Sequence, residues 1–370
     1  ASRLPLLLAG GMYGSYFSHY AGDVFALPLA LETLTSLTAV AILFGPYWFG
    51  WNSLGRFKHL AITWLLVIAL HGSLFWITVS SVWLQNPVGA IFDPSAYRLQ
   101  LVDFNAVMDN PLLMGSFIHQ LAASHAAAAG AVLAISAYRL RRDSSDAVTQ
   151  NTFKWAACWG LLAVLATAWP QDSASTSDTT TRLRQAAQQQ GAISPELQQA
   201  MKEHIQSGIE AYSALQILRD DNPPPEAIAS FNAHRDDLGY AWLLKPWHKP
   251  IVGASDKQIQ HAVQSALPSH PQQLYWLHKA MMGCGILSLV GFGWSAWQGL
   301  SRHPLSAGGA TISLYVAAFP WLSGMLGLYL AIGGQQPWII AGQLPGVMGL
   351  SSTTSFTLLL SLGGYLAIYA

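Results

Sequence analysis

The sequence predicts an all-α polytopic membrane protein with about seven transmembrane helices and a helical loop on one side of the membrane. Of its 370 residues, 52% are hydrophobic and only 10% are charged, whereas about 25% of the residues in a typical soluble domain are charged. The chain has 15 tryptophans, a residue that is enriched where a membrane meets water. The formal net charge of +0 gives no basic field for nucleic acid, and the two cysteines fit neither a disulfide framework nor a zinc pattern.

Apolar runs define the predicted spans, because each reaches or nearly reaches the roughly 20 residues that a membrane-crossing helix needs. These runs cover residues 25–49, 60–84, 112–138, 152–170, 273–299, 309–332 and 343–369. The first residues give only a short, glycine-broken run, which fits a half-helix, the remnant of a span or an uncleaved targeting stretch. We therefore divide the chain into a remnant (1–17), four spans (18–170), a loop (171–272) and three spans (273–370).

Positive charge predicts the orientation, since lysine and arginine in short loops accumulate on the cytoplasmic side. Every second loop is short and carries positive residues: first Arg56 and Lys58, then Arg139, Arg141 and Arg142, and then Arg302. We expect these loops to face the cytoplasm of a bacterial inner membrane. The loops at 85–111, 171–272 and 333–342 would then face outward.

The long loop is predicted to be folded and helical. Ser194 followed by Pro195 is typical of a helix start, and this helix can continue to about Arg219. Three consecutive prolines precede a second helix at about 226–237. The segment 255–258 has the spacing of a capping box and predicts a third helix.

The uncharged run 112–138 contains a histidine at a depth that predicts a ligand. His119 lies about seven residues inside the outward end of its span, and Met281 and Met282 lie about nine residues inside theirs. These depths are about 10 and 13 Å. A histidine and a methionine at matched depth can hold one haem iron axially. Equally, His119 could bond a neighbouring carbonyl, and the methionines could be ordinary packing residues.

Several motifs resemble subunit I of the cytochrome bd quinol oxidases, over nearly the whole chain after residue 17. They are SHYAGDVFALPLALET (18–33), GWNSLGRFKH (50–59), VWLQNPVGA (82–90), DFNAVMDNP (103–111), SFIH (116–119), LYWLHKAMMGCG (274–285) and FPW…GGQQPW (319–338). The resemblance implies that His119 and Met281 are axial ligands of a low-spin, b558-like haem b, with Lys279 as a basic residue beside it. It also implies that Glu32 lies on a proton route, although Glu32 could instead be a protonated or paired buried acid.

The chain departs from this family where oxygen would be reduced. The family's second proton-route acid is Val40 here, its haem-binding glutamate is Ile332, a nearby tryptophan is Leu328, and the arginine of its G-R-Q-P-W motif is Gln335. The histidine that ligates a high-spin haem in the family's first span also has no counterpart. We therefore expect high-spin haem b and haem d to be absent.

The residues that contact quinol in the family are altered as well. The nearest matches to its lysine and glutamate are Arg184 and Gln189. A glutamine cannot accept the proton that quinol oxidation releases. Quinone binding remains expected, whereas fast quinol oxidation does not follow.

Two further histidines have no counterpart in the family pattern. His71 and His125 each lie near mid-span on adjacent predicted helices, so they could face each other and hold a different metal or haem. Hydrogen-bonded packing histidines are the alternative. His125 follows His119 by six residues, about 240° around the helix, so the two cannot share one iron.

Three functions fit these patterns, in this order of preference. The first is a redox subunit of a respiratory oxidoreductase complex, not a complete quinol oxidase by itself. Its haem b would exchange electrons between quinone or quinol and a partner, either another membrane subunit, such as a bd-type subunit I or II, or an extracytoplasmic redox protein. The second is a non-catalytic scaffold paired with a complete oxidase. The third is a quinol:oxygen oxidoreductase with a rebuilt site.

Overall fold

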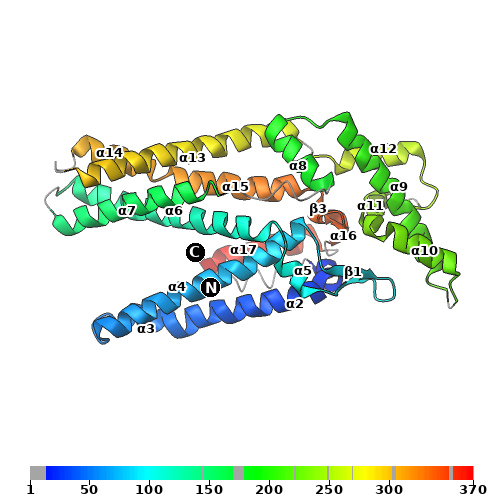
Figure 1. The fold of residues 1–370 in the computed structure, drawn as a ribbon, viewed down its shortest axis with the longest axis horizontal. Coiled ribbons are helices and arrows are strands. Elements are labelled where there is room, and N and C mark those ends of the chain that lie inside the picture. Colours follow the sequence, from blue (N-terminus) through cyan, green and yellow to red (C-terminus); the bar gives the residue numbers. More distant parts are fainter. Residues whose placement is uncertain are drawn as a thin grey trace.

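The computed structural model describes residues 14–143, 146–169, 179–220, 222–247, 250–268, 270–301, 306–349 and 353–369. Long helices run along the long axis of the molecule, and short helices and strands gather at one end of it (Figure 1). We call this end the loop end. The opposite end, where α3 (Phe44–Phe49) and α14 (Ala307–Val316) lie, is the far end.

The predicted class is confirmed, because five helical stretches are long and apolar enough to cross a membrane. They are Tyr16–Phe49, Arg56–Gln85, Leu113–Leu140, Asp256–Leu300 and Ala307–Gln335. The predicted span at 152–170 corresponds to α7 (Ala147–Ala166), which lies inside the bundle but is not among the five. Polar residues in the first half of α7, such as Gln150, Asn151 and Lys154, account for its lower hydropathy.

The first span begins ten residues earlier than predicted. Helix α2 (Ser15–Leu37) continues through the π-helical segment η1 (Thr38–Leu43) into α3. Tyr20 and Ala21 are buried at the loop end, and this packing extends the helix beyond the apolar run. Residues 15–17 therefore belong to α2 and not to a separate remnant, while residues 1–13 lie outside the described residues.

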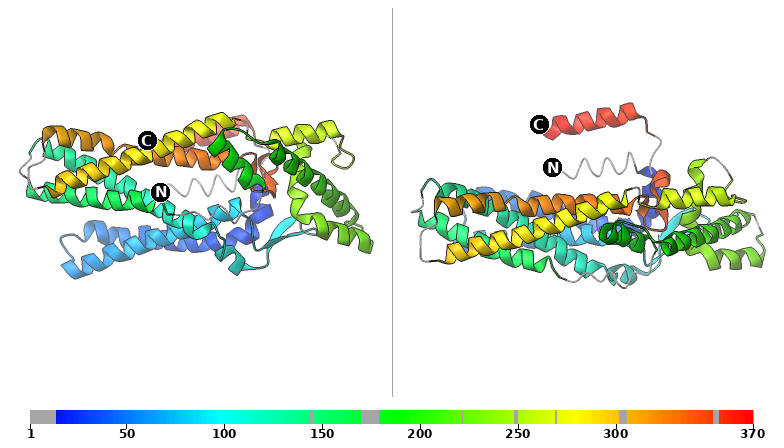
Figure 2. Two further views of the ribbon diagram at one scale, coloured as in Figure 1. Left: turned by 45° about the horizontal axis from the view of Figure 1, so that its top comes forward. Right: turned by 90° about the horizontal axis from the view of Figure 1, so that it is seen from above.

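The last predicted span, 343–369, is wrong as a single helix. Its first residues form β4 (Leu344–Pro345), which pairs with β3 (Trp338–Ile340), and the short α16 (Gly346–Gly349). Because Pro345 and Gly346 do not favour a helix interior, the chain folds back here. Helix α17 (Ser355–Tyr369) has 15 residues, about 22 Å, and stands apart from the other helices in Figure 2.

Four helices form a ring around the positions of the predicted haem ligands. Helix α6 (Leu113–Leu140) packs on α7, α7 on α13 (Pro271–Leu300), α13 on α15 (Phe319–Gln335), and α15 on α6. Helices α6 and α13 therefore face each other diagonally across the ring. Helix α4 (Arg56–Gln85) packs on α6 and joins α2 to the ring.

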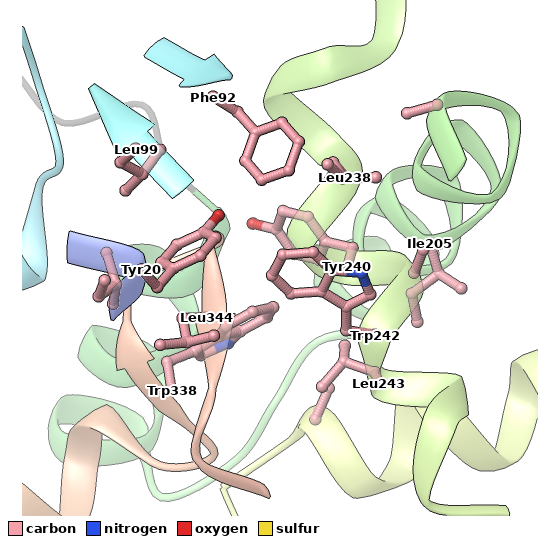
Figure 3. Close-up of a cluster of buried hydrophobic side chains, with 14 of the residues drawn as sticks. Tyr20, Phe92, Leu99, Ile205, Leu238, Tyr240, Trp242, Leu243, Trp338 and Leu344 are labelled. Carbon is pink, nitrogen blue, oxygen red and sulfur yellow. The ribbon is translucent and has the colours of Figure 1, made fainter. Parts of the chain in front are cut away.

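The loop end has one continuous hydrophobic core, shown in Figure 3. In this core the Trp242 ring lies 6.3 Å from the Phe92 ring, and the Tyr240 ring lies 5.0 Å from the Trp338 ring. Residues from all three loops that were predicted to face outward thus meet at one end, as predicted. The elements here are β1 (Ala90–Asp93), β2 (Arg98–Leu101), α5 (Phe104–Met108), α8 (Thr179–Gln190), α9 (Pro195–Ile217), α10 (Pro225–His234), η3 (Arg235–Asp237), α11 (Leu238–Ala241), η4 (Trp242–Trp247) and α12 (Asp256–Ala266).

The helix starts predicted in the long loop are confirmed. The Ser194 side chain accepts a hydrogen bond from the amide of Leu197 at the start of α9. Ser255 and Gln258 form the predicted capping box of α12. The second loop helix also forms, as α10 followed by the 3₁₀ turn η3, and begins directly after the prolines because proline favours the first helical turn.

Candidate haem site

The His119 side chain is hydrogen-bonded to the end of the neighbouring helix. Its Nδ1 lies 3.0 Å from the backbone oxygen of Thr167, at the end of α7. A carbonyl oxygen only accepts hydrogen bonds, so Nδ1 carries the proton and Nε2 of a neutral ring keeps its lone pair. Histidines that bind metals almost always donate their second ring nitrogen in this way. The half-buried His119 is therefore prepared to ligate through Nε2.

The structure separates the two candidate methionines. Met281 is half-buried and packs against the cluster that contains Leu274 and Leu330. A side-chain carbon added at Gly327 on α15 would lie 3.4 Å from the Met281 sulfur. Met282 is 49% exposed and is not among the residues packed against this cluster. Met281 is thus the methionine that contacts the neighbouring helix of the ring.

The ring is loosely packed at the depth of His119 and Met281. The structure describes every residue in three segments at this depth, and none of these residues is buried. The segments are 116–121 on α6, 275–287 on α13 and 321–329 on α15. Toward the far end the helices touch closely: a side-chain carbon at Gly160 would lie 2.2 Å from the Phe292 ring. Protein interiors are normally close-packed. The half of the ring that holds His119 and Met281 is therefore less closely packed than the half toward the far end.

Lys279 lies two residues before Met281 on α13. Its side chain is exposed, and Nζ lies 5.1 Å from the centroid of the Tyr275 ring, a cation–π contact. The expected role of Lys279 beside a haem propionate stays a prediction.

Glu32 is buried and hydrogen-bonded. Its side chain on α2 is 7% exposed, and the Ser73 hydroxyl on α4 donates to Glu32 Oε1 at 2.9 Å. A buried acid with a hydroxyl donor fits the alternative of a paired structural carboxyl. The proton route remains a prediction.

The two quinone candidates are not brought together. Arg184 donates to the Gln85 side chain at 2.8 Å and lines a cavity of about 20 Å³, enough for about one water. Gln189 follows five residues later on α8 and is exposed on another face of that helix. The cavity beside Arg184 is therefore much smaller than a quinone ring, and Gln189 does not line it.

His71 and His125 do face each other, as expected from their positions. Their rings lie 5.2 Å apart with 30° between the planes. Each Nδ1 bonds the backbone oxygen four residues earlier in its own helix, that of Val67 at 2.6 Å and that of Leu121 at 2.9 Å. The tautomer argument made for His119 therefore applies to both rings.

Comparison with known proteins decides the family. Residues 1–370 match the family model "Cytochrome bd terminal oxidase subunit I". The chain belongs to the cytochrome bd terminal oxidase subunit I family. It is 26% identical to subunit 1 of the cytochrome bd-II ubiquinol oxidase of Escherichia coli, over the whole chain and 81% of that protein. It is 24% identical to subunit 1 of the cytochrome bd ubiquinol oxidase of Bacillus subtilis, over 97% of the chain and 74% of that protein.

The fold agrees with this assignment. The bd oxidase structure from Geobacillus thermodenitrificans superposes with a TM-score of 0.67 and 19% identity, over all of this chain and 79% of that one. The chain is thus a cytochrome bd subunit I-like integral membrane protein and an oxidoreductase subunit of respiratory electron transport. Members of this family generally bind haem b and pair with other membrane subunits.

Three of the four positions that depart from the family pattern carry apolar, exposed side chains. Val40, Leu328 and Ile332 are 59%, 63% and 62% exposed. Gln335 donates to the backbone oxygens of Leu84 and Ile339 and so links α15 to the loop end. None of these four side chains is of a type that ligates haem iron.

A polar network at the loop end was not anticipated from the sequence. Asp237 accepts a hydrogen bond from Nδ1 of His204 at 2.7 Å, and Ser207 and Glu210 contact the two ring nitrogens of His234 at 2.9 and 3.0 Å. Burial alone would raise the pKa of Asp237, but hydrogen bonds from His204 and Ser207, with the charges of both histidines, hold this pKa below its ordinary value. Histidines spaced 30 residues apart carry no pattern that reveals such a cluster.

Proposed function

We propose that this subunit transfers electrons between quinone or quinol and a partner subunit through one low-spin haem b, held axially by His119 and Met281. The observation that carries the proposal is the Thr167 contact, which leaves the Nε2 lone pair of His119 available in the loose half of the ring. When bound, a haem with this ligand pair supplies a one-electron couple whose potential is raised by the thioether.

The residues of the chain have separate roles in this proposal. His119 and Met281 orient the group from diagonal helices, and the Ser323 hydroxyl donates to the Met281 backbone oxygen at 3.3 Å, which ties α15 to α13 at the site. Lys279 balances the charge of a propionate. Arg184 marks the quinone side, at the loop end, which we assign to the outer face of a bacterial inner membrane.

Oxygen reduction is not part of the proposed activity. An open high-spin iron needs a ligand and a polar distal side. Val40, Leu328 and Ile332 supply neither, so we propose that high-spin haem b and haem d do not bind here. The chain therefore needs a partner subunit to accept or deliver its electrons.

Difference spectra of the purified chain test the proposal. The reduced-minus-oxidised spectrum should show a low-spin b-type band and no d-type band. His119→Ala should abolish the His/Met haem, and Met281→Ala should shift its band and lower its potential. Met282→Ala, the matched control, should change neither. A haem content unaffected by His119→Ala would contradict the assignment.

A scaffold role is the second candidate, favoured by the exposed apolar side chains of Val40, Leu328 and Ile332. Such positions suit contact with a second membrane subunit. Reduction of the haem by added quinol would support electron transfer. A haem that quinol never reduces would support the scaffold, and oxygen uptake by the isolated chain would contradict both.

A further inference from the structure

Six polar side chains at the loop end are joined end to end by hydrogen bonds. We call them the polar row, and in order they are Thr179, His204, Asp237, Ser207, His234 and Glu210. Helix α9 supplies the second, fourth and sixth members, which are spaced three residues apart and so lie on one side of that helix. Helix α10 and η3, which pack on α9, supply the fifth and the third. After Thr179 on α8, the row therefore alternates between α9 and its packed neighbours.

The inner half of the polar row has the geometry of an imidazole base held by a carboxylate. The Thr179 hydroxyl lies 2.9 Å from Nε2 of His204, and Nδ1 of His204 lies 2.7 Å from Oδ1 of Asp237. A carboxylate only accepts hydrogen bonds, so Nδ1 carries the proton and Nε2 accepts from the Thr179 hydroxyl. In such an arrangement the imidazole takes up a proton at Nε2, and the carboxylate stabilises the imidazolium that forms.

The outer half of the polar row leads to water. The Ser207 hydroxyl bonds Asp237 and lies 2.9 Å from Nδ1 of His234, whose Nε2 lies 3.0 Å from Oε2 of Glu210. Exposure rises from 4% for Thr179 at the inner end to 62% for the Glu210 side chain at the outer end. The row thus joins a buried hydroxyl to an exposed carboxylate.

The inner end of the polar row lies beside the candidate quinone residues. Thr179 is the first residue of α8, and the next two residues, Thr180 and Thr181, line the water-sized cavity together with Arg184. Helix α8 packs on α13 and α15 of the ring, whereas α10 lies at the outermost part of the loop end (Figure 1). The row therefore starts on the membrane side of the loop end and finishes on its outer side.

Quinol oxidation needs a proton acceptor in this region. A quinol gives up two electrons and two protons when it becomes a quinone, and a haem iron takes up only the electrons, one at a time. On α8 neither Arg184 nor Gln189 can accept a proton, because a guanidinium is always charged and an amide is not a base. We propose that the polar row conducts the protons of quinol oxidation from the α8 side of the loop end to the outer water. This inference rests on the proposed function.

One proton leaves the polar row for each proton that enters it. A proton released on the α8 side reaches the Thr179 oxygen, which gives its own proton to Nε2 of His204. A proton then passes from Nδ1 through Asp237 and the serine hydroxyl to the second imidazole, which releases one through the exposed glutamate to water. The hydroxyls and rings turn back afterwards, so the net charge of the row is restored.

The rate of haem reduction in the purified full-length chain tests the proposal, with decylubiquinol or menadiol as the reductant in a stopped-flow instrument. His204→Gln keeps a side chain that forms hydrogen bonds but cannot take up a proton, so reduction by quinol should slow by about tenfold or more. Thr179→Val removes the hydroxyl at nearly constant shape and should also slow it, whereas Thr179→Ser should keep most of the rate. His234→Gln should slow it less, because the half-buried His204 ring also reaches water.

Two controls separate proton transfer from folding and haem binding. Dithionite supplies electrons without releasing quinol protons, so it should reduce the haem equally fast in every variant. Glu203→Gln is the matched variant, because Glu203 precedes His204 on α9, is exposed and accepts a hydrogen bond from the Gln199 amide at 3.1 Å, outside the polar row. Its rate with quinol should equal that of the wild type.

The two reductants give each outcome a distinct meaning. Slow reduction by quinol with normal reduction by dithionite, in both His204→Gln and Thr179→Val, supports the polar row. Wild-type rates with quinol in both variants would overturn it and leave the proposed function intact. Slow reduction by both reductants would also overturn it, since the row would then only support the fold. A wild-type haem that dithionite reduces and quinol does not would overturn the proposed function and the polar row together.

Discussion

At the residue scale, hydrogen bonds to the backbone fix the chemistry of the histidines. His119, His71 and His125 each use Nδ1 for a backbone oxygen, although His119 reaches another helix and the other two bond their own. All three therefore offer Nε2. The sequence shows how far along its span each histidine lies, but it could not select their tautomers, which depend on where carbonyl oxygens lie in space.

Asp237 gives a prediction about pH at this scale. Its pKa is lower in the folded state, so the ionised carboxylate stabilises the loop end above the ordinary aspartate pKa of about 4 and loses this effect as the pH falls through the folded-state value. Asp237→Asn should lower stability at pH 6 by about 1–3 kcal/mol, the size of a hydrogen bond to a charged group. Between pH 5 and 3 the variant should lose less stability than the wild type.

Thermal melts in detergent, followed by tryptophan fluorescence, measure this difference. Asp236→Asn is the matched control, because the Asp236 side chain is 95% exposed and forms a surface ion pair with Arg235 at 3.8 Å. An equal acid response in wild type and Asp237→Asn would show that the His204–Asp237 contact does not contribute.

At the element scale, the helix ring is tight toward the far end and loose toward the loop end. Gly160 on α7 lets the ring of Phe292 on α13 approach, and Phe292 is fully buried. Apolar periodicity could predict that these helices pack, since each has a long apolar run. It could not separate Met281 from Met282, because adjacent residues share one depth and differ only in the side of the helix that they occupy.

Gly160 gives a prediction at this scale. Gly160→Ala places a carbon against the Phe292 ring, which has no room to move, so the variant should lose on the order of 1–3 kcal/mol of stability. Gly22→Ala is the control, because Gly22 on α2 has no neighbour within 4 Å and alanine favours a helix there. Melting temperatures of the two purified variants should move in opposite directions. A melting temperature unchanged in Gly160→Ala would mean that α7 and α13 can separate freely.

The last predicted span is wrong because it was inferred from composition alone. The segment 343–369 is apolar enough for a span, yet β4 pairs with β3, and Pro345 and Gly346 turn the chain. Composition records how apolar a segment is, but it does not show that residues 344–345 pair as a strand with residues 338–340. By contrast, the caps at Ser194 and Ser255 were predictable, because a cap depends on residues within one turn.

At the scale of the whole molecule, the three larger loops share one end and the short loops lie at the other (Figure 1). The positive residues of the short loops predict that the far end faces the cytoplasm. The orientation can be tested with single cysteines in a chain whose two native cysteines are replaced. Ser95 and Glu226 mark the loop end and Ser53 the far end, and all three are exposed.

An impermeant maleimide should label Ser95→Cys and Glu226→Cys in intact spheroplasts, and Ser53→Cys only after the membrane is opened. If Ser95→Cys and Glu226→Cys were labelled from opposite sides of the membrane, their two loops could not lie at the same end of the molecule. Labelling of Ser53→Cys alone in intact spheroplasts would reverse the predicted orientation.

The core at the loop end also constrains how the chain is made. It joins Tyr20, near the start of the first span, to Phe92, Tyr240 and finally Leu344. During synthesis on the ribosome this core cannot close until Leu344 has left the exit tunnel, so all five long helical stretches must be made before it forms. The proposed haem would therefore enter the neighbouring ring after these helices are made and before the core closes. A truncated nascent chain ending before residue 338 should remain open at this end and be degraded rapidly.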